Sequence, residues 1–232
     1  MKIDNIKMKS MLKKSFVIFL IVFDSFSALS TPQIPDNIIY KGEKYKLFHS
    51  YPMESFLKKY PDKHPKKDWS SNTGLTRGYV ATFEIKGEQL YLKDIGIEDG
   101  EIINEKGRVI GPKFKSVMNE VFPNQKLVKI NWVSGLFVLP VGKANHNVPY
   151  GAYSIYERYI VLEIENGILK REKEFTYEEY EEFKKQQFEA FKESEEYEKE
   201  KKKLIRKKFT DERIDSMIQF NIIEYSTKIL VE

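Results

Sequence analysis

The stretch YVATFEIKGEQLYL, residues 79–92, indicates the fold class of this chain. Its first half alternates apolar and polar side chains, as a half-buried β-strand does. The apolar positions fall on one face, and they are Tyr79, Ala81, Phe83 and Ile85. A turn at Lys86-Gly87-Glu88 leads into a second apolar run, so the stretch predicts a β-hairpin.

Three further hairpins are predicted around this one. They cover residues 38–48 with a turn at 41–43, residues 129–139 with a turn at 134–135, and residues 156–170 with a turn at Asn166-Gly167. Asn-Gly favours a tight two-residue turn. Consecutive hairpins favour an antiparallel meander over a parallel sheet.

Two short helices are expected to interrupt the sheet, at residues 53–60 and 113–122. In the second, Phe114, Val117, Met118 and Val121 are spaced i, i+3, i+4 and i+7. This spacing gives one apolar stripe that is suited to packing on a sheet face.

The pattern changes at Thr176. Thr176 and Glu179 form a capping-box sequence, and the charged segment that follows has no Gly or Pro up to about Phe209. We expect a long charged helix there, a short helix from Thr210 to Asn221, and a final strand over residues 222–231. The predicted fold class is therefore α+β, an antiparallel meander with packed short helices, followed by this helical extension.

Residues 1–30 have the pattern of a secretory signal peptide. Five lysines precede an eight-residue apolar run, which is shorter than the roughly 20 residues that a membrane-spanning helix needs. Ala28-Leu29-Ser30 is a small-x-small cleavage sequence, so we expect cleavage after Ser30. An uncleaved membrane anchor is the alternative, and Asp24 argues against it. The predicted division is a signal peptide at 1–30, a sheet-rich domain at 31–175 and a helical extension at 176–232.

The charge of the mature chain argues against recognition of nucleic acid through net basicity. Residues 1–30 hold five of the chain's 39 basic and two of its 35 acidic side chains, which leaves 34 and 33. We therefore expect no nucleic-acid partner. We also expect no transmembrane helix in the mature chain. A protein or an envelope polymer is the expected partner.

No local motif indicates a metal, a cofactor or a catalytic group. There is no cysteine, no P-loop, no GxGxxG and no GxSxG sequence. The histidines are His49, His64 and His146, whose spacings of 15 and 82 residues match no metal-binding pattern. We predict no catalytic residue, no metal ligand and no cofactor, although distant residues can still assemble an active site.

Candidate binding residues lie at the start of the central hairpin. Arg77 stands between two glycines just before the strand that carries Glu84. Its guanidinium group can bind a carboxylate or a phosphate of a ligand. The alternative is a structural ion pair with Glu84, Glu157 or Glu163.

A second group of candidates lies near residue 150. The loop holds His146, Tyr150 and Tyr153, and Glu157 follows it. Aromatic rings and hydrogen-bonding groups together suit a polar ligand such as a sugar. The alternative is an ordinary turn whose tyrosine closes the end of the sheet.

The run RGYVATFE at Arg77–Glu84, followed by LYL at residues 90–92, resembles a strand pair in small bacterial domains of unknown function. A later piece, Tyr150-Gly151 with Ser154-Ile155-Tyr156-Glu157, is similar to another part of those domains. The resemblance spans residues 38–170 and implies one sheet domain, but it implies no activity.

Taken together, these features predict an exported, non-catalytic binding protein of the bacterial cell envelope or secretome. The first alternative is an envelope-directed hydrolase that uses Glu84, Glu157 and Glu163, since glycosidases need two carboxylates about 5–10 Å apart. The second is an intracellular interaction protein whose N-terminus only resembles a signal peptide.

Overall fold

The computed structural model describes residues 33–48, 50–65, 73–144 and 154–231. Their strands form one nine-stranded sheet in the order β2-β1-β3-β4-β9-β8-β7, with β5 and β6 each paired to β4. The strands are β1 Asp36–Tyr40, β2 Glu43–Leu47, β3 Val80–Lys86, β4 Gln89–Ile103, β5 Val109–Ser116, β6 Val128–Lys129, β7 Gly135–Ala144, β8 Tyr156–Glu165 and β9 Ile168–Thr176. β1 and β3 pair in parallel, so the sheet is mixed rather than the antiparallel meander that was predicted.

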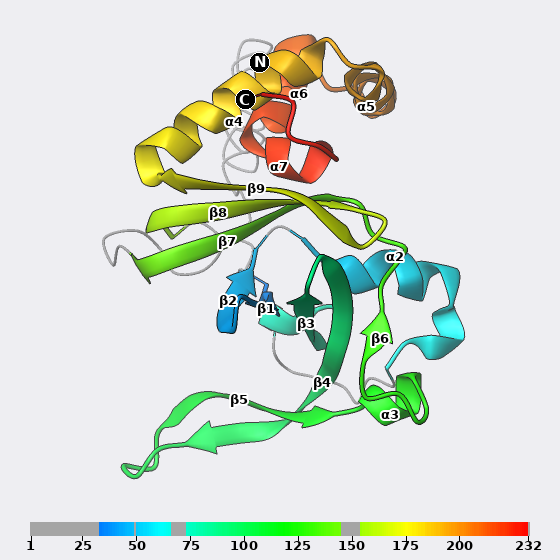
Figure 1. Cartoon of the computed structure of the whole chain (residues 1–232), viewed down its shortest axis with the longest axis vertical. Coiled ribbons are helices and arrows are strands. Elements are labelled where there is room, and N and C mark those ends of the chain that lie inside the picture. Colours follow the sequence, from blue (N-terminus) through cyan, green and yellow to red (C-terminus); the bar gives the residue numbers. More distant parts are fainter. Residues whose placement is uncertain (1–32, 49, 66–72, 145–153, 232) are drawn as a thin grey trace, which may run out of the picture. The chain divides into compact units, whose positions relative to one another are not determined.

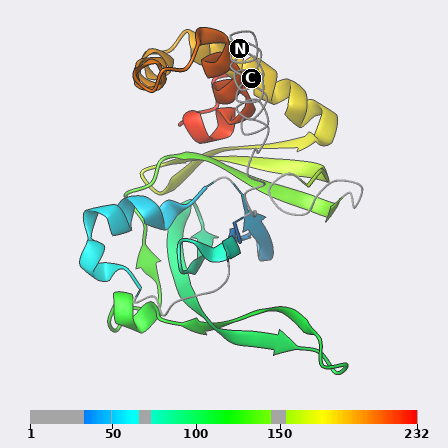
Figure 2. The same cartoon turned by 180° about the vertical axis from the view of Figure 1, so that it is seen from behind.

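The helices of the described residues fall into two groups. Figure 1 shows α4 to α7 gathered on one side of β7, β8 and β9, with β1 to β4 and α2 on the other side, and Figure 2 shows the same layers from behind. The α-helices are α2 Pro52–Lys59, α3 Met118–Val121, α4 Tyr177–Lys192, α5 Glu195–Arg206, α6 Asp211–Phe220 and α7 Ile222–Tyr225; short 3-10 turns are η1 Pro61–Lys63 and η2 Thr73–Leu75. The predicted α+β class is confirmed.

Strands β7 and β8 are buried on both faces. Phe137 and Leu162 point into an apolar cluster with β1–β4, α2 and α3, which we call the inner core. Val138 and Val161 point the opposite way, into a cluster with α4–α7 that we call the outer core. Successive side chains of a strand face opposite sides, so a strand covered on both faces is apolar at almost every position.

The sheet curls around the inner core. An antiparallel bridge between Phe48 and Val138 brings the end of β2 to β7, at the other end of the strand order. The amide of Gln89 ties the middle together, because its Nε2 donates to the carbonyl oxygens of Leu90, Ile130 and Gly167. These bonds join β4, the segment after β6 and the β8–β9 turn.

Most local predictions are confirmed. The hairpins β1–β2, β3–β4 and β8–β9 form with turns at the expected positions, and α2 lies where a helix was predicted. In the Asn166-Gly167 turn both residues have positive φ. A β-carbon at Gly167 would overlap the carbonyl oxygen of Ile130, so this close approach requires glycine.

The hairpin predicted over residues 129–139 is wrong. β6 pairs with β4, and β7 pairs with β8. Between them, the Ile130 N–H donates to Leu90 O, and Val133 O accepts from the Gly167 N–H. Backbone bonds to distant strands therefore replace the local hairpin.

The helix predicted over residues 113–122 is also largely wrong. Residues up to Ser116 belong to β5, and only Met118–Val121 is helical. Val117, Met118 and Val121 are buried in the inner core as the stripe predicted, but Phe114 is exposed on β5. Pairing with β4 outweighs the helical spacing at Phe114.

The long charged helix is two helices. The capping box at Thr176 starts α4 as predicted, but α4 ends at Lys192 and Ser194 caps a new helix, accepting a hydrogen bond from Tyr197 N–H. The break turns α5 back, so that Tyr197 and Leu204 are buried in the outer core. α6 begins after Thr210 and ends at Asn221, as predicted.

The strand predicted over residues 222–231 does not form. Residues 222–225 are the helix α7, and side chains rather than a strand bond the backbone that follows. Gln187 Nε2 donates to Lys228 O at 2.6 Å, and Gln187 Oε1 accepts from Leu230 N–H at 2.9 Å. Glu163 Oε2 accepts from Ile229 N–H at 2.8 Å. These polar side chains supply the partners that a neighbouring strand would have supplied.

In the described part of the chain, no helix combines the length and apolar character needed to cross a membrane. Residues 1–32 lie outside that part, so the signal peptide and the domain division built on it stay predictions.

Candidate functional site

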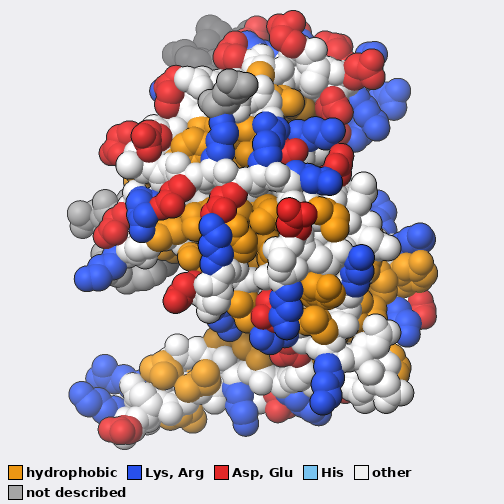
Figure 3. Space-filling view, in the orientation of Figure 1, with side chains coloured by type: hydrophobic (Ala, Val, Ile, Leu, Met, Phe, Trp, Pro, Cys, Tyr) orange, Lys and Arg blue, Asp and Glu red, His pale blue; other side chains and the backbone are white. Residues whose placement is uncertain are grey.

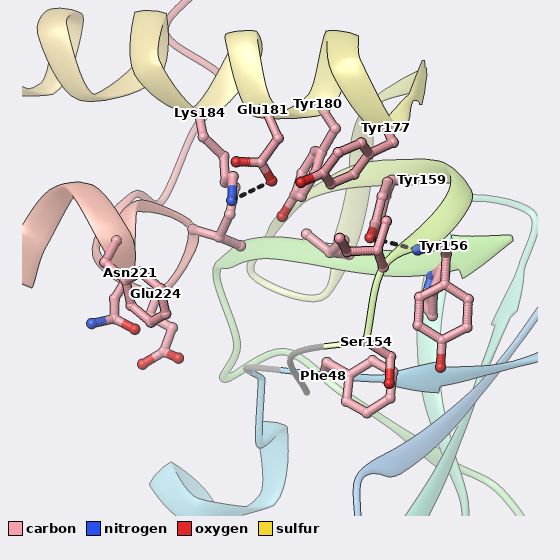
Figure 4. A pocket seen from close by; sticks show the side chains of 15 residues that line it. Phe48, Ser154, Tyr156, Tyr159, Tyr177, Tyr180, Glu181, Lys184, Asn221 and Glu224 are labelled. Atoms are coloured by element: carbon pink, nitrogen blue, oxygen red, sulfur yellow. Dashed lines mark hydrogen bonds and ion pairs between the residues drawn. The ribbon is translucent and has the colours of Figure 1, made fainter. Parts of the chain in front are cut away.

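A pocket of about 290 Å³ lies where β8, α4 and the junction of α6 and α7 meet. Four tyrosines line it, and we call it the tyrosine pocket (Figure 4). Its walls are Phe48, Val138, Pro140, Ser154, Ile155, Tyr156, Tyr159, Tyr177, Tyr180, Glu181, Lys184, Phe220, Asn221, Ile223 and Glu224.

One face of α4 forms the upper wall. Tyr177, Tyr180, Glu181 and Lys184 are spaced i, i+3, i+4 and i+7, which places them on the same side of a helix. The capping box at Thr176 begins α4 directly at the end of β9. The helix therefore starts at the sheet, with its first two tyrosines beside β8.

Strand β8 forms the lower wall. The Tyr159 ring stacks on the Tyr180 ring with 4.3 Å between centroids and 20° between planes. The Tyr156 N–H donates to the Tyr159 hydroxyl at 3.0 Å, which fixes the position of that oxygen. The Tyr156 ring is partly exposed and lies 6.2 Å from the ring of Phe48 at the end of β2.

Burial disfavours ionisation of three of the four phenols. It raises the pKa values of Tyr156, Tyr159 and Tyr180 above the usual value for tyrosine. The hydrogen bond from Tyr156 N–H acts in the opposite direction on the Tyr159 pKa, but burial is the larger effect. At neutral pH the pocket therefore presents aromatic faces and neutral hydroxyl groups.

The charged groups of the pocket are Glu181, Lys184 and Glu224. Lys184 Nζ lies 2.7 Å from Glu181 Oε1, and both side chains are partly exposed. Figure 4 shows this ion pair extending from α4, with Asn221 and Glu224 coming from the neighbouring helical segment. The pocket holds one more acidic than basic group, which disfavours an anionic ligand.

The ionisable side chains of the pocket are its four tyrosines, Glu181, Lys184 and Glu224. Among the described residues that line it there is no histidine, and its one lysine is paired with Glu181. Across the part of the chain that the structure describes, no group of three or more His, Asp or Glu side chains is arranged to hold a metal ion.

Arg77 is partly buried and belongs to a structural cluster that does not line this pocket. Its Nη1 donates to Asp36 Oδ1 at 3.1 Å, and its Nη2 donates to Ile34 O at 2.7 Å. The guanidinium carbon lies 4.0 Å from the centre of the Tyr51 ring. The ion pair that the sequence offered as an alternative exists, but its carboxylate is Asp36 rather than one of the three predicted glutamates. It anchors residues 34–36 to the start of β3.

The three predicted carboxylates do not meet in the tyrosine pocket, because none of them lines it. Glu84 on β3 is 3.2 Å from Lys93 Nζ. Glu163 is buried and accepts from Arg171 Nε at 2.9 Å. Glu157 lies against Gly142, where a β-carbon would overlap its Oε2.

Three predicted binding residues, His146, Tyr150 and Tyr153, lie outside the described residues. The chain resumes at Ser154, and Ser154, Ile155 and Tyr156 line the tyrosine pocket. The segment that the sequence singled out is thus continuous in sequence with one wall of the pocket.

The pocket residues of α4 were not predicted. No binding role was assigned from the sequence to Tyr177, Tyr180, Glu181 or Lys184. Their shared face was a readable signal. The missing information was Tyr159, whose position beneath Tyr180 depends on the pairing of β8 with β9.

Comparisons of this chain with protein-family models, with curated proteins and with solved structures give no match.

Proposed function

We propose that this protein is an exported, non-catalytic binding protein of the bacterial cell envelope or secretome, and that the tyrosine pocket holds a saccharide unit of an envelope polymer. The observation that carries the proposal is the combination of stacked and partly exposed tyrosines with polar groups in one pocket. The export part rests on the pattern of residues 1–30.

The chemistry of the walls supports a neutral or amino-bearing sugar. A sugar ring has one apolar face, which packs on an aromatic ring, and a rim of hydroxyl groups that need donors and acceptors. The partly exposed rings of Tyr156 and Tyr177 provide such faces. Lys184 provides donors, Glu181 provides acceptors, and Asn221 provides both.

The size of the pocket limits the ligand. A volume of about 290 Å³ is at the lower end of the range for small-molecule sites, roughly 300–1,000 Å³. We therefore expect one sugar ring to be buried and the rest of the polymer to stay in solvent.

Binding can be measured by isothermal titration calorimetry with a panel of neutral, amino-bearing and acidic oligosaccharides. We expect binding of a neutral or amino-bearing member, and about fivefold weaker binding by Tyr156→Ala, because loss of one stacking ring removes roughly 1 kcal/mol. Tyr60→Ala is the matched control, since Tyr60 is an exposed tyrosine at the C-terminal end of α2 that does not line the pocket. Failure of the whole panel, or equal loss in both variants, would reject the site.

Export has its own test. Mass spectrometry of the protein from its native host should find an N-terminus at Thr31 and material outside the cytosol. An intact Met1 on cytosolic protein would reject export while leaving the binding measurement interpretable.

A further inference from the structure

A two-stranded arm extends from the sheet. β4 pairs with β3 only as far as Gly96, and from Ile97 to Ile103 its only strand neighbour is β5. β5 pairs with no strand other than β4 among the described residues. We call residues 97–115 the arm; Figure 1 shows it projecting away from the other strands. Within the described ranges, no strand therefore pairs with either outer edge of the arm.

The arm carries more than half of the large apolar side chains that are exposed in the described residues. Five of the nine large hydrophobic residues that are exposed lie on it, with 37% to 64% of their surface accessible. They are Ile102, Ile103, Val109, Ile110 and Phe114. Figure 3 shows hydrophobic side chains gathered on this projection. An isolated two-stranded hairpin is only marginally stable, and a free apolar edge is a template for another strand.

The charges of the two arm strands are complementary. Between residues 97 and 103, β4 carries Glu98, Asp99 and Glu101 and no basic residue. Between residues 109 and 116, β5 carries Lys113 and Lys115 and no acidic residue. Side chains of neighbouring strands meet on each face of a sheet, so opposite charges favour pairing and like charges oppose it.

This pattern identifies the partner strand. If β4 of one copy paired with β4 of another, carboxylates would face carboxylates, and pairing β5 with β5 would bring lysines together. Pairing β4 of one copy with β5 of the next matches acid with base and apolar with apolar. We propose that the arm is a self-association surface, on which β5 of a second copy of this chain adds to the free edge of β4.

A lipid surface fits the arm less well. The tip that joins the two strands is the polar sequence Asn104-Glu105-Lys106-Gly107-Arg108. Backbone groups at the two outer edges would also lose their hydrogen bonds to water in a hydrocarbon layer. Another copy of the arm satisfies those groups.

The contact is head-to-tail, because two different edges meet. Such a contact leaves one free edge at each end, so it forms rings or open chains of copies rather than a closed symmetric dimer. The inference is independent of the tyrosine pocket, since no arm residue lines that pocket.

Sedimentation velocity of the purified protein over a wide concentration range tests association. We expect concentration-dependent oligomers, and at least about tenfold weaker association for Ile110→Lys. Ile205→Lys is the matched control, because Ile205 is also an exposed isoleucine but lies on α5. A wild-type protein that stays monomeric, or equal weakening in both variants, overturns the proposal.

A charge exchange tests the pairing of β4 with β5. The double variant Asp99→Lys/Glu101→Lys makes both edges basic, and Lys113→Glu/Lys115→Glu makes both acidic. Each variant alone should fail to associate, and an equimolar mixture should recover association, because acidic edges then meet basic ones. Circular dichroism confirms that each variant is folded.

Self-association of either charge variant at wild-type strength, or a mixture of folded variants that stays monomeric, would exclude the pairing. Binding of a monomeric wild-type protein to anionic lipid vesicles, lost in Ile110→Lys, would assign the arm to a membrane and overturn the proposal.

Discussion

The β7–β8 pair and the β4–β5 arm are both antiparallel ribbons of one sheet, yet they have opposite surroundings. β7 and β8 have the inner core on one face and the outer core on the other. The arm has neither face covered at Ile103 and Ile110, which are more than half exposed. Sequence alone does not separate them, because both are rich in Ile and Val. The difference is the layer of helices that follows β9 in the chain.

We expect the β7–β8 pair to contribute to stability and the β4–β5 arm to contribute to association. Residues buried on both faces of β7 and β8 contribute the transfer of apolar surface from water. The same residue types on the arm contribute little to folding and remain available to another copy. A substitution should therefore have a different effect according to the ribbon that it enters.

The largest expected difference comes from placing a carboxylate on each ribbon. Val161 is fully buried on β8, and Val161→Asp puts an unpaired charge in the outer core. We expect the free energy of unfolding to fall by about 4 kcal/mol or more. Ile110→Asp on the arm should change it by less than about 0.5 kcal/mol. Urea unfolding of both variants measures the contrast, and similar losses would show that the arm is also covered.

The second test measures how the stability contributed by a buried carboxylate depends on pH. Asp36 on β1 is fully buried beside Arg77, and burial raises the pKa of its carboxyl group to about 6 despite the opposing effect of Arg77. In the unfolded chain the value is near 3.8. Between these values the folded protein binds more protons than the unfolded one, so stability from this group falls as the pH rises.

We therefore compare wild-type protein with Asp36→Asn by urea unfolding at pH 4, 5, 6 and 7. The stability of the wild type relative to this variant should decrease by up to about 3 kcal/mol from pH 4 to pH 7. If the stability of the wild type relative to Asp36→Asn instead increased with pH, the effect of Arg77 on the pKa of the Asp36 carboxyl group would outweigh that of burial.

A smaller effect is expected from the bonds that fasten the last residues over the outer core. Gln187→Ala removes the donor to the Lys228 carbonyl and the acceptor of the Leu230 N–H. Each lost hydrogen bond contributes about 1 kcal/mol, so we expect the free energy of unfolding to fall by about 2 kcal/mol. The adjacent Gln186→Ala is the matched control, because that side chain is exposed and bonds only to Glu182 within α4. Hydrogen exchange at Leu230 should accelerate in the first variant alone; equal rates would exclude the role of Gln187.

Much of the fold was predictable where a few neighbouring residues decide it. The turn at Asn166-Gly167 and the caps at Thr176 and Thr210 were placed correctly, because turn and cap chemistry acts over two to four residues. The alternation from Tyr79 to Ile85 also predicted the buried face of β3, where all four apolar residues lie in the inner core.

The errors share one physical cause, which is competition from distant partners. Residues 130–133 bond to β4 and to the β8–β9 turn rather than to β7. The backbone after α7 bonds to side chains of Glu163 and Gln187 rather than to a strand. Neither set of partners is visible in the local pattern, because they lie about 40 to 66 residues away.

The candidate site was predictable only in part for the same reason. The face of α4 that carries Tyr177 and Lys184 follows from helical spacing. The pocket exists only because Tyr159 and Phe48 come to that face through pairing of β8 with β9 and bridging of β2 to β7. Arg77 was predicted to bind a ligand or to pair with one of three glutamates, but the carboxylate that it contacts belongs to Asp36, 41 residues before it.

The smallest expected effect concerns the start of the covering layer. Thr176 Oγ1 accepts from Glu179 N–H, and Glu179 Oε2 accepts from Thr176 N–H, so Thr176→Ala removes one of the two bonds of the capping box. We expect about 1 kcal/mol of lost stability in urea unfolding. Thr210→Ala at the start of α6 is the comparison, since its single 3.4 Å bond to Arg213 N–H should contribute less.

Because α4 carries one wall of the pocket, Thr176→Ala should also weaken ligand binding slightly, whereas self-association through the arm should be unchanged. A loss of self-association in Thr176→Ala would show that the covered ribbon and the arm are coupled, which would contradict their separate roles.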